Sequence, residues 1–141
     1  HKIYRVSNVD QLTRWMIPIR ESFGLSPEVL AAYFELFQSQ GFDERLPWKL
    51  YVGEVAGEPV SSVRLFATGQ TAGIFNVAVI PSMRGKGYGS EITRAALSAG
   101  KRLGCKLSIL AATDMGYPVY ERLGFKECCA AEIYFSPEMV R

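Results

Sequence analysis

The chain has 141 residues, of which 48% are hydrophobic and 21% charged, a composition typical of one globular domain and unlike that of disordered or fibrous chains. Sixteen Lys and Arg residues against fourteen Asp and Glu leave a formal net charge of +2, which excludes the strongly basic signature of a nucleic-acid-binding protein. No apolar run approaches the ~20 residues that cross a bilayer, and no signal peptide opens the sequence. We therefore expect a single cytoplasmic domain with neither a nucleic acid nor a membrane as partner.

The cysteines and the histidine exclude several kinds of chemistry. Cys105, Cys128 and Cys129 are odd in number and lack the spacing of a disulfide framework or a zinc cage, so we interpret them as reduced thiols. The single histidine is His1, and at the chain end we expect neither a fixed general base nor a metal ligand. Catalysis is therefore expected to depend on Tyr, carboxylates, Lys or backbone amides, without a metal. The absence of an initial Met suggests a tag remnant or a piece of a longer chain, such as its C-terminal domain.

The first part of the chain predicts one strand and two helices. Residues 2–6 have the alternation of a short strand, and apolar residues over 12–23 recur at helical spacing. Pro18 is expected to bend or split this first helix, because its ring removes a backbone donor and clashes with the preceding turn. A second helix is predicted to begin at Ser26-Pro27-Glu28, which combines a capping hydroxyl, a first-turn proline and an acid at the positive end of the helix dipole. It is predicted to end at Gly41.

From Trp48 onward the spacing changes to that of strands separated by turns. An antiparallel meander of three strands is predicted over residues 50–55, 60–66 and 73–80. A helix over 90–103, a strand over 106–112, a short helix over 118–123 and a final extended stretch over 125–135 follow. This order predicts one domain over residues 1–141 of the α/β (α+β) class, with a mixed, mostly antiparallel central sheet flanked by helices.

The candidate functional motif is a glycine-rich loop, Pro81-Ser82-Met83-Arg84-Gly85-Lys86-Gly87-Tyr88-Gly89, between a predicted strand and a predicted helix. Free amides at a helix N-terminus bind phosphate oxygens, glycines let the backbone approach them, and the two basic side chains add positive charge. A Walker loop is excluded, because Ile80 stands where that pattern needs a glycine. A Rossmann fingerprint is disfavoured, because Ser90 stands where its third glycine belongs.

The loop resembles the pyrophosphate loop of the GNAT superfamily of acetyl-CoA-dependent N-acetyltransferases, in which Arg or Gln is followed after two residues by Gly-x-Gly or Gly-x-Ala. Here these positions are Arg84, Gly87 and Gly89. Asn76-Val77-Ala78-Val79 resembles the strand before that loop, and Tyr120 to Phe125 resembles the Tyr-x-x-x-Gly-Phe segment of the family. With the order of elements, the resemblance extends over nearly the whole chain. It implies a GNAT-like fold and direct transfer of an acetyl group from acetyl-CoA to a primary amine in a ternary complex.

The resemblance also implies roles for individual residues. Backbone groups of Val77 and Val79 would pair with the pantetheine arm, the amide of Val77 or Ala78 would polarise the thioester carbonyl, and Tyr120 would hydrogen-bond the CoA sulfur. A half-buried packing tyrosine is the alternative role for Tyr120. The full set of expected cofactor-binding residues is Val77, Ala78, Val79, Arg84, Gly85, Lys86, Gly87, Tyr88, Gly89 and Ser90.

No single residue is marked as the acceptor of the amine proton. Many relatives carry a Glu on the strand before the loop, whereas this chain has Ile74-Phe75-Asn76 there. Glu35, Glu54 and Asp114 are alternatives, although each is also typical of a solvated surface acid. A water held by Asn76 is a further alternative, so Asn76 joins Tyr120 as a candidate catalytic residue.

The acceptor is expected to be a small-molecule or peptide amine of unspecified identity. An aromatic set offers a lining for its pocket, with core packing as the alternative for most members: Trp15, Tyr33, Phe34, Phe37 and Trp48. Thr113, Asp114, Met115 and Tyr117 are further candidates for contacts with pantetheine or acceptor.

Only one extended stretch follows Gly-Phe, where the family has two strands. The last strand is therefore missing, supplied by a partner in a homodimer, or replaced by upstream chain. Two rival functions also remain at this point. One is a non-catalytic acyl-CoA-binding module, and the other is a nucleotide-binding protein.

Overall fold

The computed structural model describes residues 1–134 and 136, and it divides the chain into two compact units, residues 1–110 and 111–141. The first unit contains β1 (Lys2–Arg5), α1 (Val9–Phe23), α2 (Pro27–Gln40), β2 (Trp48–Val55), β3 (Glu58–Thr68), β4 (Thr71–Val79), a short 3-10 helix (Pro81–Met83), α3 (Tyr88–Arg102) and β5 (Leu107–Leu110). The second unit contains α4 (Tyr117–Arg122).

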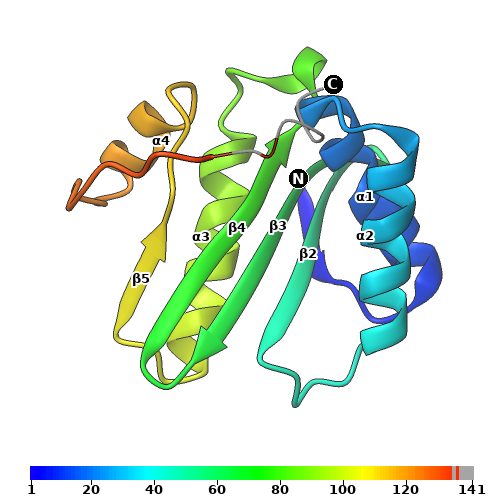
Figure 1. Ribbon diagram of the computed structural model, residues 1–141, viewed down its shortest axis with the longest axis horizontal. Helices are drawn as coiled ribbons and strands as arrows, with labels where there is room; N and C mark the ends of the chain where they lie inside the picture. Colours follow the sequence, from blue (N-terminus) through cyan, green and yellow to red (C-terminus); the bar gives the residue numbers. More distant parts are fainter. Residues whose placement is uncertain (135, 137–141) are drawn as a thin grey trace. The chain divides into compact units, whose positions relative to one another are not determined.

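The five strands of the first unit form one sheet in the order β1-β2-β3-β4-β5. The first three pairings are antiparallel, and only β4 and β5 run parallel. Helices α1 and α2 cover one face of this sheet and α3 covers the other (Figure 1). The predicted fold class, a mixed and mostly antiparallel sheet between helices, is confirmed.

Each face of the sheet has its own hydrophobic core. Under α1 and α2 the buried residues are Val6, Leu12, Trp15, Met16, Ile19, Phe37, Leu50, Val52 and Ala78. Under α3 they are Tyr51, Val63, Leu65, Ala72, Ile74, Ile92, Ala96 and Ala99. Trp15 ties α1 to β3, because its Nε1 donates to the carbonyl of Val63 over 3.1 Å and its own carbonyl accepts from Ser62 Oγ over 2.8 Å.

Both N-terminal helices begin with side-chain caps. The Asn8 side chain accepts from the Gln11 amide and Ser26 Oγ accepts from the Val29 amide, which satisfies an amide without a helical partner in each first turn. Of the two effects predicted for Pro18, a bend or a split of the helix, the split is wrong, because one helix runs from Val9 to Phe23. Pro18 is buried in the core, and we attribute the continuity of the helix to this packing, which offsets the loss of one backbone hydrogen bond.

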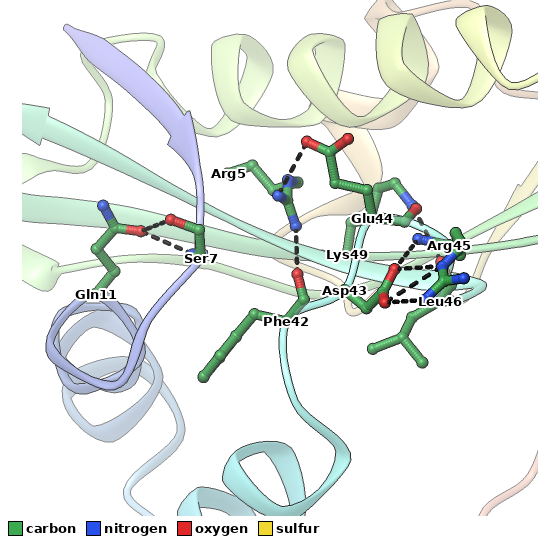
Figure 2. A network of polar contacts seen from close by, with 9 residues as sticks. All are labelled: Arg5, Ser7, Gln11, Phe42, Asp43, Glu44, Arg45, Leu46 and Lys49. Atoms are coloured by element: carbon green, nitrogen blue, oxygen red, sulfur yellow. Dashed lines mark hydrogen bonds and ion pairs between the residues drawn. The ribbon is translucent and has the colours of Figure 1, made fainter.

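The connection between α2 and β2 is held by a polar network (Figure 2). Arg5 of β1 donates to the carbonyl of Phe42 over 3.0 Å and to the carboxylate of Glu44 over 3.3 Å. Lys49 Nζ donates to the carbonyls of Glu44 and Leu46 over 2.8 and 3.0 Å. These bonds anchor the loop to β1 and β2, and so position the end of α2 beside the start of β2.

In the second unit, α4 is followed by residues 125–134 without an assigned strand. The prediction of an extended strand over these residues is therefore wrong, and residue 135 lies outside the described residues. An extended stretch forms a strand only where a neighbouring strand offers backbone partners. Ile133 and Tyr134 are instead exposed, at 76% and 86%. None of the helices in the described ranges is both long and apolar enough to cross a membrane.

Candidate active site

Strand β4 separates from β5 halfway along its length. The parallel pairing runs from Thr71 opposite Leu107 to Ile74 opposite Leu110 and ends there. β4 itself continues to Val79 and keeps its pairing with β3. In the first unit, the side of β4 that faced β5 is therefore without a strand partner from Phe75 onward, and its backbone groups there are available to a ligand.

A β-bulge lies at the point where the two strands separate. Ser62 is opposite Ala78 but Arg64 is opposite Phe75, so that one residue of β3 faces two of β4, Asn76 and Val77. Asn76 has φ of 53°, a left-handed conformation that Asn adopts more readily than most residues. Its Oδ1 is buried and has no hydrogen-bond partner among the described atoms. A bulge with an unsatisfied acceptor is the kind of irregularity found beside functional sites.

Strand alternation decides which backbone groups beyond the bulge face outward. The Ile80 amide donates to the Val60 carbonyl over 3.0 Å, which makes Ala78 and Ser62 the next hydrogen-bonded pair and turns the backbone of Val79 away from β3. The Val79 carbonyl already accepts from Ser22 Oγ over 2.9 Å and from Arg84 Nε over 3.2 Å. Ala78 is therefore engaged with β3, and of the two backbone groups of Val79 only the amide is left for pairing with a ligand.

The glycine-rich loop leads directly into α3. Gly85 and Gly87 have φ of 76° and 90°, values at which other residues are strained. Gly87 is the N-cap of α3, no side chain caps that helix, and its first backbone bond runs from the Glu91 amide to the Gly87 carbonyl over 3.0 Å. The amides of Tyr88, Gly89 and Ser90 thus have no partner within the helix. This arrangement fits an anionic phosphate group.

The two basic residues of the loop are held in different ways. Arg84 uses its Nε to bind the Val79 carbonyl, as described above, and so connects the loop to the end of β4. Lys86 is exposed, and its Nζ lies 3.5 Å from Met83 Sδ. Arg84 therefore has a structural contact in addition to the phosphate role predicted for it.

Tyr120 belongs to the second unit, where it lies on α4. Its ring packs edge-on against Phe125, with centroids 6.1 Å apart, and closely over Gly116, where an added Cβ would lie 2.8 Å from the ring. The side chain is half-buried, and burial raises the pKa of its hydroxyl. The phenol is therefore a hydrogen-bond donor throughout the physiological pH range.

The carboxylates proposed as bases lie in different environments. Glu54 accepts from the Tyr4 hydroxyl over 2.5 Å and from Arg14 Nε over 2.6 Å. Burial alone would raise the pKa of Glu54, but these two hydrogen bonds outweigh it and the pKa is lowered. Glu54 is thus held in an ion pair with Arg14, and its lowered pKa makes it a poor proton acceptor. Glu35 and Asp114 are exposed on the surfaces of their own units.

His1, for which the sequence predicts no role as a fixed general base, nevertheless has a defined position in the first unit. Its side chain is 4% exposed, with Nδ1 2.5 Å from the carboxylate of Glu91 and Nε2 3.0 Å from Ser61 Oγ. The ring packs over Gly53, where an added Cβ would lie 2.2 Å from Nε2. Because Gly53 lacks a side chain, the sheet has room for an imidazole that the sequence pattern did not reveal.

A pocket of about 370 Å³ opens in the first unit between α2 and the sheet. Its lining residues come from α2, β2, β3 and β4: Leu36, Phe37, Gln40, Trp48, Arg64, Phe66 and Phe75. We call this the aromatic pocket. Of the aromatic residues suggested for an acceptor site, Phe37 and Trp48 line it, whereas Trp15 is fully buried in the core.

Sequence reasoning missed the strand residues of this pocket. Arg64 and Phe66 point to the same face because they are two positions apart on β3, and Phe75 lies immediately before the bulge at Asn76. A charged residue inside the apolar run of residues 60–66 was the available signal. Burial lowers the pKa of the Arg64 guanidinium, which nevertheless stays protonated at neutral pH.

Comparisons with known proteins agree with this geometry. Residues 19–125 match the Acetyltransferase (GNAT) family. Glucosamine-6-phosphate N-acetyltransferase from Arabidopsis thaliana is 19% identical with a TM-score of 0.71, covering 96% of this chain and 98% of that chain. An acetyltransferase from Trypanosoma brucei is 21% identical with a TM-score of 0.69, over 96% and 98% of the two chains. AAC(6')-Iy, in complex with the bisubstrate analog CoA-S-monomethyl-acetylneamine, is 15% identical with a TM-score of 0.77, over 96% and 97%. No curated protein matches the sequence.

The chain belongs to the acetyltransferase (GNAT) family. The structural likenesses, at these identities, bear on the fold, while the family match extends over most of the chain. The predicted GNAT resemblance and the predicted acyltransferase activity are confirmed. Among the three functions considered from the sequence, this favours the acetyltransferase over a nucleotide-binding protein.

Proposed function

We propose that this protein transfers an acetyl group from acetyl-CoA to a primary amine, directly and within a ternary complex. The observation that carries the proposal is the course of β4, which leaves β5 at Ile74 and leads through Gly85 and Gly87 into the uncapped N-terminus of α3. An extended arm with a pyrophosphate at one end matches a strand edge followed by a helix N-terminus. Acetyl-CoA supplies the activated acetyl group as co-substrate.

The backbone of the first unit does most of the binding in this proposal. The amides of Tyr88, Gly89 and Ser90 hold the pyrophosphate, supported by the positive end of the α3 dipole. Of the two amides considered for polarising the thioester carbonyl, that of Val77 is the better candidate, because Ala78 is paired with Ser62 of β3. The pairing role expected for Val79 is limited to its amide, since its carbonyl is occupied by Ser22 and Arg84.

Two side chains, those of Asn76 and Tyr120, assist the proton transfer from the amine and the departure of the sulfur. In the transfer, the amine nitrogen bonds to the acetyl carbon as the carbon–sulfur bond breaks. One amine proton passes to a water and the departing sulfur takes up a proton from solvent, so that the products are the acetylated amine and the thiol of CoA. Asn76 orients that water through its buried, unpartnered Oδ1. Tyr120 donates a hydrogen bond to the departing sulfur, and its raised pKa keeps the phenol protonated for that purpose.

We further place the protein in the cytoplasm as a single GNAT domain. Cys105, Cys128 and Cys129 are free cysteines, and the latter two are exposed, which suits a reducing compartment. A homodimer that completes the sheet edge stays a proposal, which sedimentation at micromolar concentration would test.

Calorimetric titration with acetyl-CoA, followed by an assay of thiol release with an amine panel, tests the function. We expect micromolar binding of acetyl-CoA, no response to NAD, and amine-dependent thiol release. Tyr120→Phe is expected to reduce kcat roughly 10- to 100-fold at unchanged CoA affinity. Tyr134→Phe is the matched control, because that hydroxyl donates to Glu132 on the surface of the same unit. Equal kcat in wild type and Tyr120→Phe would remove Tyr120 from the mechanism.

Two substitutions at Asn76 separate its side chain from its backbone. Asn76→Gly removes Oδ1 and tolerates φ of 53°, whereas Asn76→Ala removes Oδ1 and strains the backbone by ~1 kcal/mol. If Oδ1 orients the water, both variants lose about tenfold or more in kcat, and Asn76→Ala also melts earlier. A fully active Asn76→Gly enzyme would show that the residue serves only the bulge.

A further inference from the structure

The aromatic pocket contains one positive charge and no negative one. Its lining residues are aromatic or apolar except for Gln40 and Arg64. Some of the described Asp and Glu side chains of the first unit form ion pairs with other residues, and none of them forms an ion pair with Arg64. The pocket thus has a positive end within apolar walls.

The Arg64 guanidinium is positioned by rings rather than by hydrogen bonds. Its Cζ lies 4.9 Å from the ring centroid of Phe75 and 5.7 Å from that of Phe37, distances typical of cation–π contacts. Its Nε is buried and lacks a hydrogen-bond partner within the described part of the chain. A buried donor on a charged group is costly unless something pairs with it. An anionic oxygen bound at the part of the guanidinium that lines the pocket would offset this cost through its charge.

The dimensions and place of the pocket suit the non-reacting part of a small acceptor. A volume of about 370 Å³ falls at the low end of the range for small-molecule sites. Leu36, Phe66 and Phe75 are large apolar side chains that line it and stay 39–44% exposed. Phe75 directly precedes Asn76, where β4 has left β5. A molecule in the pocket therefore lies next to the strand segment that we assign to the thioester.

We infer that the acceptor is a small primary amine with an apolar body and a carboxylate, and that Arg64 binds this carboxylate. The inference rests on the proposed acetyltransferase function and names its substrate class. The planar fork of Arg matches two carboxylate oxygens. A phosphate dianion would need a second cation, which the lining does not offer. Polyamines and other polycations would place positive charge against Arg64 and are disfavoured.

Trp48 allows the inference to be tested by binding alone. It lines the pocket, whereas the other tryptophan, Trp15, is fully buried in the core. We would titrate the protein with N-acetyl-phenylalanine and with N-acetyl-phenylalaninamide, following tryptophan fluorescence. These probes differ in the carboxylate only, and neither has a free amine whose own pKa would complicate the comparison. Trp48→Phe identifies the reporting residue by abolishing the response.

The expected result is that the carboxylate probe binds ~10- to 100-fold more tightly than the amide. Arg64→Met should remove this preference, and Arg64→Lys, which keeps the charge but loses the fork, should retain part of it. Arg45→Met is the matched control, because it removes an arginine whose side chain is 90% exposed. Equal binding of the two probes by the wild type, or a preference that survives in Arg64→Met, would overturn the inference. The wild-type comparison decides the matter even if Arg64→Met does not fold.

Titration of the same samples with acetyl-CoA separates the two proposals. Suppose that acetyl-CoA binds and amines are acetylated, but the two probes bind with equal affinity. The proposed function then stands, and the inference that the acceptor carries a carboxylate is wrong. If the carboxylate preference is present but acetyl-CoA does not bind, the proposed function fails while the assignment of Arg64 to an anionic ligand survives.

Discussion

The β4–α3 segment, residues 74–90, and the aromatic pocket differ in how the chain builds them. The segment is continuous in sequence and acts mainly through backbone groups, with an unpaired strand edge, two glycines at positive φ and three free amides. The pocket is assembled from side chains of α2, β2, β3 and β4. The polar network of Figure 2 supports it indirectly, by anchoring the loop that connects α2 to β2.

This difference suggests a division of labour. A backbone site recognises a group that is the same in every reaction, such as a pyrophosphate, and depends little on side-chain identity. A side-chain pocket determines which molecule is accepted, because its charge and shape change with single substitutions. Variants of the two regions should therefore affect different ligands.

The largest effect is expected from Gly87→Glu. Gly87 has φ of 90° and is the N-cap of α3, so a Glu there strains the backbone and places a carboxylate where phosphate oxygens approach. We expect acetyl-CoA affinity to fall roughly 100-fold or more, with the Trp48 response to the carboxylate probe retained. Calorimetry and fluorescence measure the two effects.

Gly104→Glu is a close control for this substitution. Gly104 lies just past the other end of the same helix, with φ of 89°, and an added Cβ at either glycine meets no atom within 4 Å. Both variants are expected to lose about 1 to 2 kcal/mol of stability from the left-handed conformation. Micromolar acetyl-CoA binding by Gly87→Glu, or its loss in Gly104→Glu, would contradict the assignment of the loop.

A smaller effect, on the pocket alone, is expected from Gly73→Ala. An added Cβ at Gly73 would lie 2.6 Å from Cε2 of Phe75, so the ring must move and change the shape of the pocket. We expect the carboxylate probe to bind about tenfold more weakly, at unchanged acetyl-CoA affinity. If Phe75 transmits the effect, Gly73→Ala should cost less in a Phe75→Leu background, as a double-mutant cycle would measure. Additive losses would exclude Phe75 as the intermediary.

The contrast between the two regions also explains how far the sequence could be interpreted. The meander, the helix starting near Ser90 and the phosphate-binding loop follow from local signals, since strand alternation, glycines and caps act over a few residues. Two features depend on the register between β3 and β4: the bulge at Asn76 and the cation–π contact of Arg64 with Phe75. This register cannot be predicted from a local sequence pattern. The final strand predicted over 125–135 is wrong for residues 125–134 for a related reason, because a strand needs a paired neighbour and the local sequence does not show whether one is present.

The smallest effect on activity is expected from Glu54→Gln, which tests whether Glu54 is the base. In the folded protein the pKa of Glu54 is lowered, so its carboxylate stabilises the fold above the pKa of the unfolded chain, and this contribution is lost as the pH falls through the lower folded value. Wild-type stability should therefore drop more steeply than that of Glu54→Gln as the pH falls below ~4.5.

At neutral pH we expect Glu54→Gln to lose about 1 to 3 kcal/mol of unfolding free energy, measured in denaturant, because Arg14 and Tyr4 lose a charged partner. Glu44→Gln should lose less, since the Glu44 side chain is 83% exposed. Since Glu54 is bound to these partners, kcat of Glu54→Gln should remain within about twofold of wild type. Loss of a general base would instead lower kcat ~100-fold or more. A fall of that size would show that Glu54 is the base and would remove the water-orienting role from Asn76.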